Sequence, residues 1–128
     1  MTPEVKNAVD EICAAFRERS VEIVEDREGG AVVTVSALPL DGSPYAQADT
    51  FVGFHITHPY PYADVYPHFV RHDLNRRDGK AFGEGFSIGT FRDKPAVQIS
   101  RRSNKLDPAT NTALLKLQKV LRWLKSRP

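Results

Sequence analysis

Apolar residues near the amino terminus recur at the spacing of an amphipathic helix. They follow one another at intervals of four, three and four positions: Val5, Val9, Ile12 and Phe16. This spacing places them on one helix face. Thr2 stands at the N-cap position and Pro3 at the first helical position, which is a common way for a helix to begin. The pattern predicts a helix over residues 3–19.

The next segments have the alternation of strands. Residues 21–25 alternate as VEIVE, residues 31–38 are rich in β-branched side chains, and REGG between them supplies a turn. This order predicts a β-hairpin. Residues 49–57, DTFVGFHIT, then place Val52, Phe54 and Ile56 on one face of a third strand, where they fill its inner side.

Prolines end the third strand. Three of them cannot donate ladder hydrogen bonds and bias their neighbours to extended shapes: Pro59, Pro61 and Pro67. The chain therefore leaves the sheet at a proline-tyrosine corner, and we expect a short fourth strand over residues 68–71. Four glycines in the following stretch, Gly79, Gly83, Gly85 and Gly89, predict an irregular loop. Residues 96–100 are expected to be only briefly extended.

The last element is a second amphipathic helix. Asp107 is expected at its N-cap and Pro108 at its first position. An apolar stripe then runs to the chain end through Ala113, Leu117, Val120, Leu121 and Leu124. The predicted fold is one α+β domain over residues 1–128: an N-terminal helix, a four-stranded antiparallel meander, the corner, a long ordered loop and a C-terminal helix. Strands that follow one another without intervening helices exclude a doubly wound parallel sheet.

Composition adds little to the predicted fold, but it bears on the cellular compartment in which we expect the protein. The 128 residues carry a net charge of +2 and one cysteine, Cys13. A single cysteine forms no intramolecular disulfide, which fits a reducing cytoplasm. The apolar runs fall short of the roughly 20 residues that span a bilayer, so we expect no membrane segment. Cys13 falls on the buried side of the first helix and is expected to be a core residue.

The order of elements and the corner resemble the ubiquitin-conjugating-enzyme (UBC) fold and its RWD relatives. Tyr60-Pro61 and Tyr66-Pro67 stand where such proteins carry YPxxPP, and the HDLN segment, with His72 and Asn75, stands where they carry His-Pro-Asn. The segment LDPATNTALLKLQKVL is similar to the family's segment after its active site. The resemblance implies a bacterial UBC-like protein, of the kind found in conjugation and antiphage operons.

The chain lacks a cysteine at the position where the family carries its catalytic one. A conjugating enzyme receives a ubiquitin-like C-terminus on a cysteine about eight residues after the Asn. That count reaches Ala81, Phe82 and Gly83, none of which is a nucleophile. Ser87 lies close, but an alkoxide needs a general base and makes a poorer carrier. The catalytic candidates are therefore His72, Asn75 and Ser87, with Asn75 more simply interpreted as a residue that shapes its loop.

Three functions are compatible with this sequence. The first is a non-catalytic binding module that docks a ubiquitin-like protein, an activating enzyme or another protein partner. Its partner-binding residues are expected to be Tyr60, Tyr62, Tyr66, Arg76, Arg77, Arg101 and Arg102. The second is an active conjugating enzyme, a thioester or oxyester carrier with an unconventional or replaced nucleophile. The third, less favoured, is a nucleic-acid or phosphorylated-partner binder that uses the arginines together with Arg71.

Other chemistry finds little support. The four histidines lack the spacing and companion ligands of a metal centre, and GEG in FGEGF lacks the context of a dinucleotide fingerprint. We therefore expect neither a metal nor a cofactor. The basic residues of the second half are most simply a solvated face, with Arg101 and Arg102 paired to Asp93 or Asp107. Trp123 either closes the edge of the core or marks a contact surface.

Overall fold

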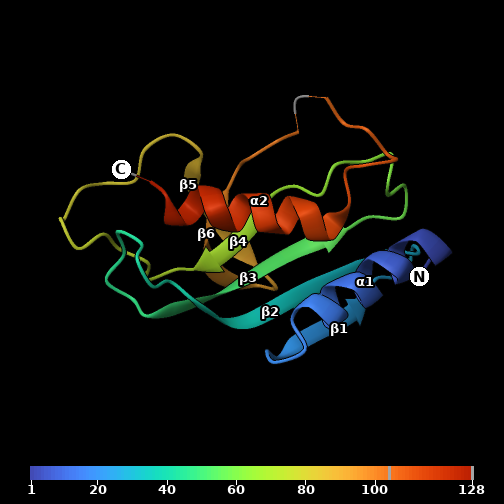
Figure 1. Ribbon diagram of the computed structural model, residues 1–128, viewed down its shortest axis with the longest axis horizontal. Coiled ribbons are helices and arrows are strands. Elements are labelled where there is room, and N and C mark those ends of the chain that lie inside the picture. Colours follow the sequence, from blue (N-terminus) through green and yellow to red (C-terminus); the bar gives the residue numbers. More distant parts are fainter. Residues whose placement is uncertain (104, 128) are drawn as a thin grey trace.

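The computed structural model describes residues 1–103 and 105–127. Six antiparallel strands form one sheet in the order β1-β2-β3-β4-β6-β5 (Figure 1). The strands and the two helices have these bounds: α1 Pro3–Ala15, β1 Val21–Glu25, β2 Ala31–Pro39, β3 Asp49–Ile56, β4 His68–Arg71, β5 Phe86–Phe91, β6 Lys94–Ile99 and α2 Ala113–Lys125. The predicted α+β class is confirmed, whereas the predicted sheet of four strands is too small.

The two helices share one core with the inner face of the sheet. Val52, Phe54 and Ile56 of β3 are fully buried, and they join one cluster with Ile12 of α1 and Leu117 of α2. The inner face predicted for the third strand is therefore confirmed. Within the described residues 1–103 and 105–127, no helix is both long enough and apolar enough to cross a bilayer.

The β5–β6 hairpin was missed by the prediction of an irregular loop. Gly85 has a φ of +90° and precedes the strand, while Gly89 lies inside β5 opposite Ala96. The turn itself is made by Arg92 and Asp93, both with positive φ, a backbone shape that glycine usually supplies. The glycines thus marked neither the turn nor a loop, and residues 94–99 form a full strand rather than a brief extended piece.

The hairpin folds across the sheet face that the helices leave open. Phe91 stacks with Phe51 of β3 and Phe69 of β4, at centroid distances of 6.0 and 5.3 Å. The Arg92 guanidinium forms an ion pair with Glu22 of β1. The tip of a hairpin at one edge of the sheet therefore reaches the strand at the opposite edge.

Both helices differ from their predicted bounds. The first helix ends at Ala15 and not at residue 19, because Phe16 takes a non-helical C-cap conformation. The second begins at Ala113 with Thr112 as N-cap, and the Thr112 hydroxyl accepts a hydrogen bond from the Leu115 N–H. The prediction of Asp107 as that cap was wrong. Asp107 caps a separate turn, where its side chain accepts from the Ala109 N–H and its carbonyl from the Asn111 N–H.

Candidate partner-binding surface

Tyrosines hold helix α2 at both ends. Tyr60, in the corner, is buried, and its hydroxyl accepts a hydrogen bond of 3.0 Å from the N–H of Ala113, the first residue of α2. The Tyr45 hydroxyl donates a bond of the same length to the Leu124 carbonyl near the helix end. These bonds satisfy one group at each terminus that the helix itself leaves open. Tyr60 therefore supports the start of α2 and presents little of its surface to a partner.

The other two tyrosines of the corner do reach the surface. Tyr62 is 77% exposed. Tyr66 is half-buried, and the guanidinium of Arg102 lies over its ring, 4.8 Å from the centroid. Hydrogen bonding to Ser100 and then to Arg102 lowers the pKa of the Tyr66 hydroxyl. The corner therefore offers one free aromatic side chain and one aromatic-cation pair to solvent.

A row of aromatic rings leads from the glycine-containing loop to α2. Phe82 stacks on Phe86 at 4.7 Å, and Phe86 stacks on Trp123 of α2 at 5.0 Å. The guanidinium of Arg101 lies 5.0 Å from the centroid of the Trp123 ring. Trp123 is partly buried and packs against the core, so it closes the edge of the core and also supports a charged surface group.

Arg101 and Arg102 therefore rest on aromatic rings. The sequence interpretation paired them with Asp93 or Asp107, but within residues 1–103 and 105–127 they form no ion pair with either carboxylate. A guanidinium that stacks on a ring keeps its N–H groups in its own plane, free to bind a further acceptor. These two of the predicted partner-binding arginines remain available.

Three other arginines of the sequence interpretation serve the loops that follow β4. Arg71 forms a 2.6 Å ion pair with Asp73, and Arg76 is nearly buried and pairs with Asp78 at 2.9 Å. Arg77 donates to the Ser43 and Tyr45 carbonyls, at 2.5 and 3.2 Å. The charges of Arg71 and Arg76 are paired with carboxylates, and Arg77 uses two of its donors on main-chain carbonyls.

His72 and Asn75 lie in one loop but contact different neighbours. The Asn75 side chain accepts a 2.6 Å hydrogen bond from the Gln47 amide, and the Asn75 N–H donates to the Gln47 side-chain oxygen at 3.0 Å. Asn75 therefore ties this loop to the loop before β3. His72 instead lines a hollow of about 610 Å³ on the open face of the sheet, together with Phe51 and Phe91.

The position that resembles the thioester site holds no sulfur. Phe82 there is packed between Phe86 and Tyr45. Ser87 is exposed on the edge strand β5 and faces Gln98 across the ladder, and Gln98 is not a general base. Cys13 lies on α1, half-buried and packed against the core.

A network that no spacing in the sequence suggested joins the corner to α2. The Asp64 carboxylate accepts hydrogen bonds from the Ser103 N–H at 2.7 Å and from the Lys116 ammonium at 3.2 Å. Burial raises the pKa of Asp64, but these hydrogen bonds outweigh it and hold the pKa below its ordinary value. Arg101 and Arg102 precede Ser103, so this network fixes the segment that carries them.

His68 belongs to the core. It is fully buried beside Phe54, and neither ring nitrogen has a hydrogen-bond partner among the described residues. Burial, with a contribution from Lys116, lowers the pKa of His68 to about 3.

The described residues contain no group of three or more His, Cys, Asp or Glu side chains arranged to hold a metal ion.

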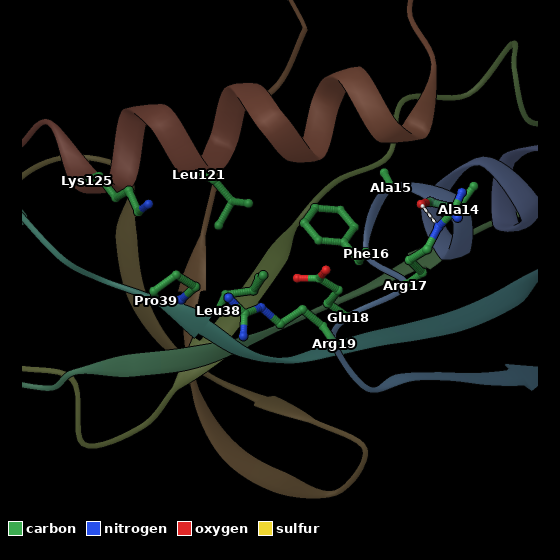
Figure 2. Close-up of a pocket in the computed structure, with 10 residues that line it drawn as sticks. All are labelled: Ala14, Ala15, Phe16, Arg17, Glu18, Arg19, Leu38, Pro39, Leu121 and Lys125. Atoms are coloured by element: carbon green, nitrogen blue, oxygen red, sulfur yellow. Dashed lines mark hydrogen bonds between the residues drawn. The ribbon is translucent and has the colours of Figure 1, made fainter.

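A hollow of about 480 Å³ separates the end of α1 from α2. Figure 2 shows Phe16 and Leu121 pointing into it above Leu38 of β2. Its rim mixes charges, with Glu18 beside Arg19. This mixture selects no class of ligand.

No family model, curated protein or solved structure matches this chain. The resemblance to UBC proteins therefore stays a prediction that rests on the residues of the corner and of the HDLN segment.

Proposed function

We propose that this chain is a non-catalytic UBC-like module that docks a protein partner in a bacterial ubiquitin-like conjugation or antiphage system. The partner is a ubiquitin-like protein, an activating enzyme or another catalytic protein. The proposal is supported by the residue found where the resemblance would put the thioester cysteine. Phe82 is stacked there on Phe86, while the one cysteine, Cys13, lies half-buried on α1.

A docking role also fits the surface between the corner and α2. Tyr62 is exposed, and Arg101 and Arg102 are held on aromatic rings. Aromatic and arginine side chains are enriched among the residues that dominate binding energy at protein interfaces. An arginine whose position is already fixed loses less conformational entropy when it binds a carboxylate. The expected partner surface is therefore acidic.

The first experiment asks whether the chain carries an acyl group. It is incubated with ATP, its cognate activating enzyme and a ubiquitin-like protein. We expect no covalent adduct of the chain on a non-reducing gel. An adduct that dithiothreitol removes would establish a thioester carrier instead. One that resists dithiothreitol but disappears in Ser87→Ala would establish an oxyester carrier.

The second experiment measures docking directly. Isothermal titration calorimetry with the same two proteins is expected to show saturable binding of one of them. Arg101→Glu is expected to weaken that binding by about tenfold or more, because the variant puts a like charge against an acidic surface. Lys94→Glu makes the same change of charge on the β5–β6 hairpin and should leave the affinity within about twofold. Absence of binding to both proteins would contradict the proposal.

A further inference from the structure

A hollow of about 550 Å³ opens between α2 and the segment that precedes it. Its lining contains no carboxylate and five basic side chains: Arg101, Arg102, Lys105, Lys116 and Lys119. The Asp64 carboxylate forms an ion pair with Lys116 at 3.2 Å and neutralises it. The other four basic side chains form no ion pair with a carboxylate of residues 1–103 and 105–127.

The polar groups of this basic hollow are mostly donors. The Asn111 side-chain oxygen is already used, since it accepts a 2.5 Å hydrogen bond from the Asp107 N–H, so its NH₂ group is left to donate. The Ser103 hydroxyl donates to Asp64 and accepts from Lys116. Arginine and lysine side chains have donors and no acceptors. A ligand that satisfies such a lining has to bring several acceptor oxygens and negative charge.

The arrangement is also rigid where it meets the ligand. Arg101 is stacked on Trp123 and Arg102 on Tyr66, while the Asp64 network fixes the backbone at Ser103. Lys105 and Lys119 are exposed and add two further charges, one from the segment before α2 and one from α2 itself. Planar guanidinium groups suit bidentate contacts to a tetrahedral oxyanion, and lysines add point charges.

We propose that this basic hollow is a binding site for a compact phosphate-bearing polyanion, with a charge density of the order of pyrophosphate. A single carboxylate presents only two oxygens, too few for the donors that converge here. A long nucleic acid requires an extended basic track, whereas Arg71, Arg76 and Arg77 are engaged elsewhere. This inference does not rest on the proposed docking of a protein partner.

Trp123 makes the site measurable. It is the one tryptophan of the chain, it lines the hollow, and the guanidinium groups of Arg101 and Arg127 both lie over its ring, so its emission responds when ligand binding changes this surrounding. The purified chain is titrated with sodium pyrophosphate at constant ionic strength, by fluorescence and in parallel by calorimetry. We expect saturable binding of one pyrophosphate per chain that weakens steeply with added salt.

Two exposed lysines supply a matched pair of variants. Lys119→Gln removes one charge from the hollow and is expected to weaken pyrophosphate binding by about tenfold. Lys94→Gln removes one charge from the β5–β6 hairpin and is expected to change it by less than about twofold. Circular dichroism confirms that both variants are folded. Equal weakening by both would show a response to net charge alone and would overturn the proposal.

Two further ligands define the chemistry. Citrate carries a comparable charge on carboxylates, and binding as tight as that of pyrophosphate would overturn the preference for phosphate. ADP distinguishes two sources of the same group. Tighter binding of ADP identifies a nucleotide, because the nucleoside then adds contacts, whereas equal binding identifies the free phosphate group. No heat and no change of emission up to millimolar pyrophosphate would overturn the proposal as a whole.

Discussion

The Tyr60 hydroxyl accepts a 3.0 Å hydrogen bond from the Ala113 N–H and so joins the proline-tyrosine corner to the first turn of α2. This bond satisfies one of the four N–H groups that a helix leaves open at its start. The corner is thereby part of the support of α2 and not only a bend that takes the chain out of the sheet.

Tyr60→Phe is expected to lower the free energy of unfolding by about 1–2 kcal/mol, because it leaves a buried N–H without an acceptor. Tyr62→Phe is the matched control, since Tyr62 is 77% exposed, and it should change stability by less than about 0.5 kcal/mol. Urea unfolding measures both. Equal effects of the two substitutions would show that the Tyr60 hydroxyl contributes nothing specific.

Asp64→Asn is expected to cost about 1–3 kcal/mol, because it leaves the Lys116 ammonium, a mostly buried charge, without its counterion. Asp10→Asn breaks the exposed pair with Lys6 and should cost about 0.5 kcal/mol or less. Thermal and urea unfolding at pH 7 provide the comparison. If Asp64→Asn costs no more than Asp10→Asn, the network does not fix the segment before α2.

The stability of the protein should fall with decreasing pH because of His68. Its pKa is about 3 in the folded chain and about 6.5 in an unfolded one. Between these values the unfolded chain binds one more proton, so folding loses up to about 1.4 kcal/mol per pH unit from this group. The loss begins as the pH drops below about 6.5 and stops near the folded pKa.

His68→Leu removes this proton and should flatten the dependence of unfolding free energy on pH between about pH 6.5 and 5, above the titration of ordinary carboxylates. The measurement is a series of urea unfolding curves. An unaltered slope in His68→Leu would show that His68 is already protonated or hydrated in the folded chain.

Gly53→Ala should disturb the hairpin that crosses the sheet. A Cβ at Gly53 would collide with the Phe91 ring, so the ring has to move away from Phe51 and Phe69. We expect a loss of about 1–3 kcal/mol from this overpacking. Gly83→Ala is the control, because nothing lies within 4 Å of its Cβ position, and it should be nearly neutral. A tolerated Gly53→Ala would mean that the hairpin is not held against the sheet.

Local signals predicted part of this fold well. Thr2 and Pro3 marked the start of α1, and the alternation of Val52, Phe54 and Ile56 gave the buried face of β3 correctly. Each of these signals comes from the period of the element itself. The α+β class followed from the order of such segments.

Other parts depend on contacts between distant residues. Gly89 predicted a loop, yet in β5 it makes room for Gln98 and Phe69, and its strand is held by pairing with β6. Asp107 has the composition of a helix cap, but the helix starts where Tyr60 offers an acceptor to Ala113. Tertiary partners decided these cases, and a single sequence does not display them.

The candidate surface was likewise predicted only in part from the sequence. Sequence reasoning named Arg101 and Arg102, because charge is visible in a sequence, but it paired them with carboxylates. The rings that support them, Tyr66 and Trp123, lie far away along the chain. Lys105 and Lys119 join them only because the Asp64 network closes the segment before α2 onto the helix.

The Arg92–Glu22 ion pair holds the β5–β6 hairpin over the sheet face that lies away from the helices and so shapes the surface on that side. The hairpin lies there as a ridge, with the Phe51, Phe91 and Phe69 rings beneath it. On that side a binding protein therefore meets an uneven, charged surface and not the flat face of a β-sheet. Protein contacts made by this chain should concentrate on the opposite flank, near Tyr62 and the start of α2.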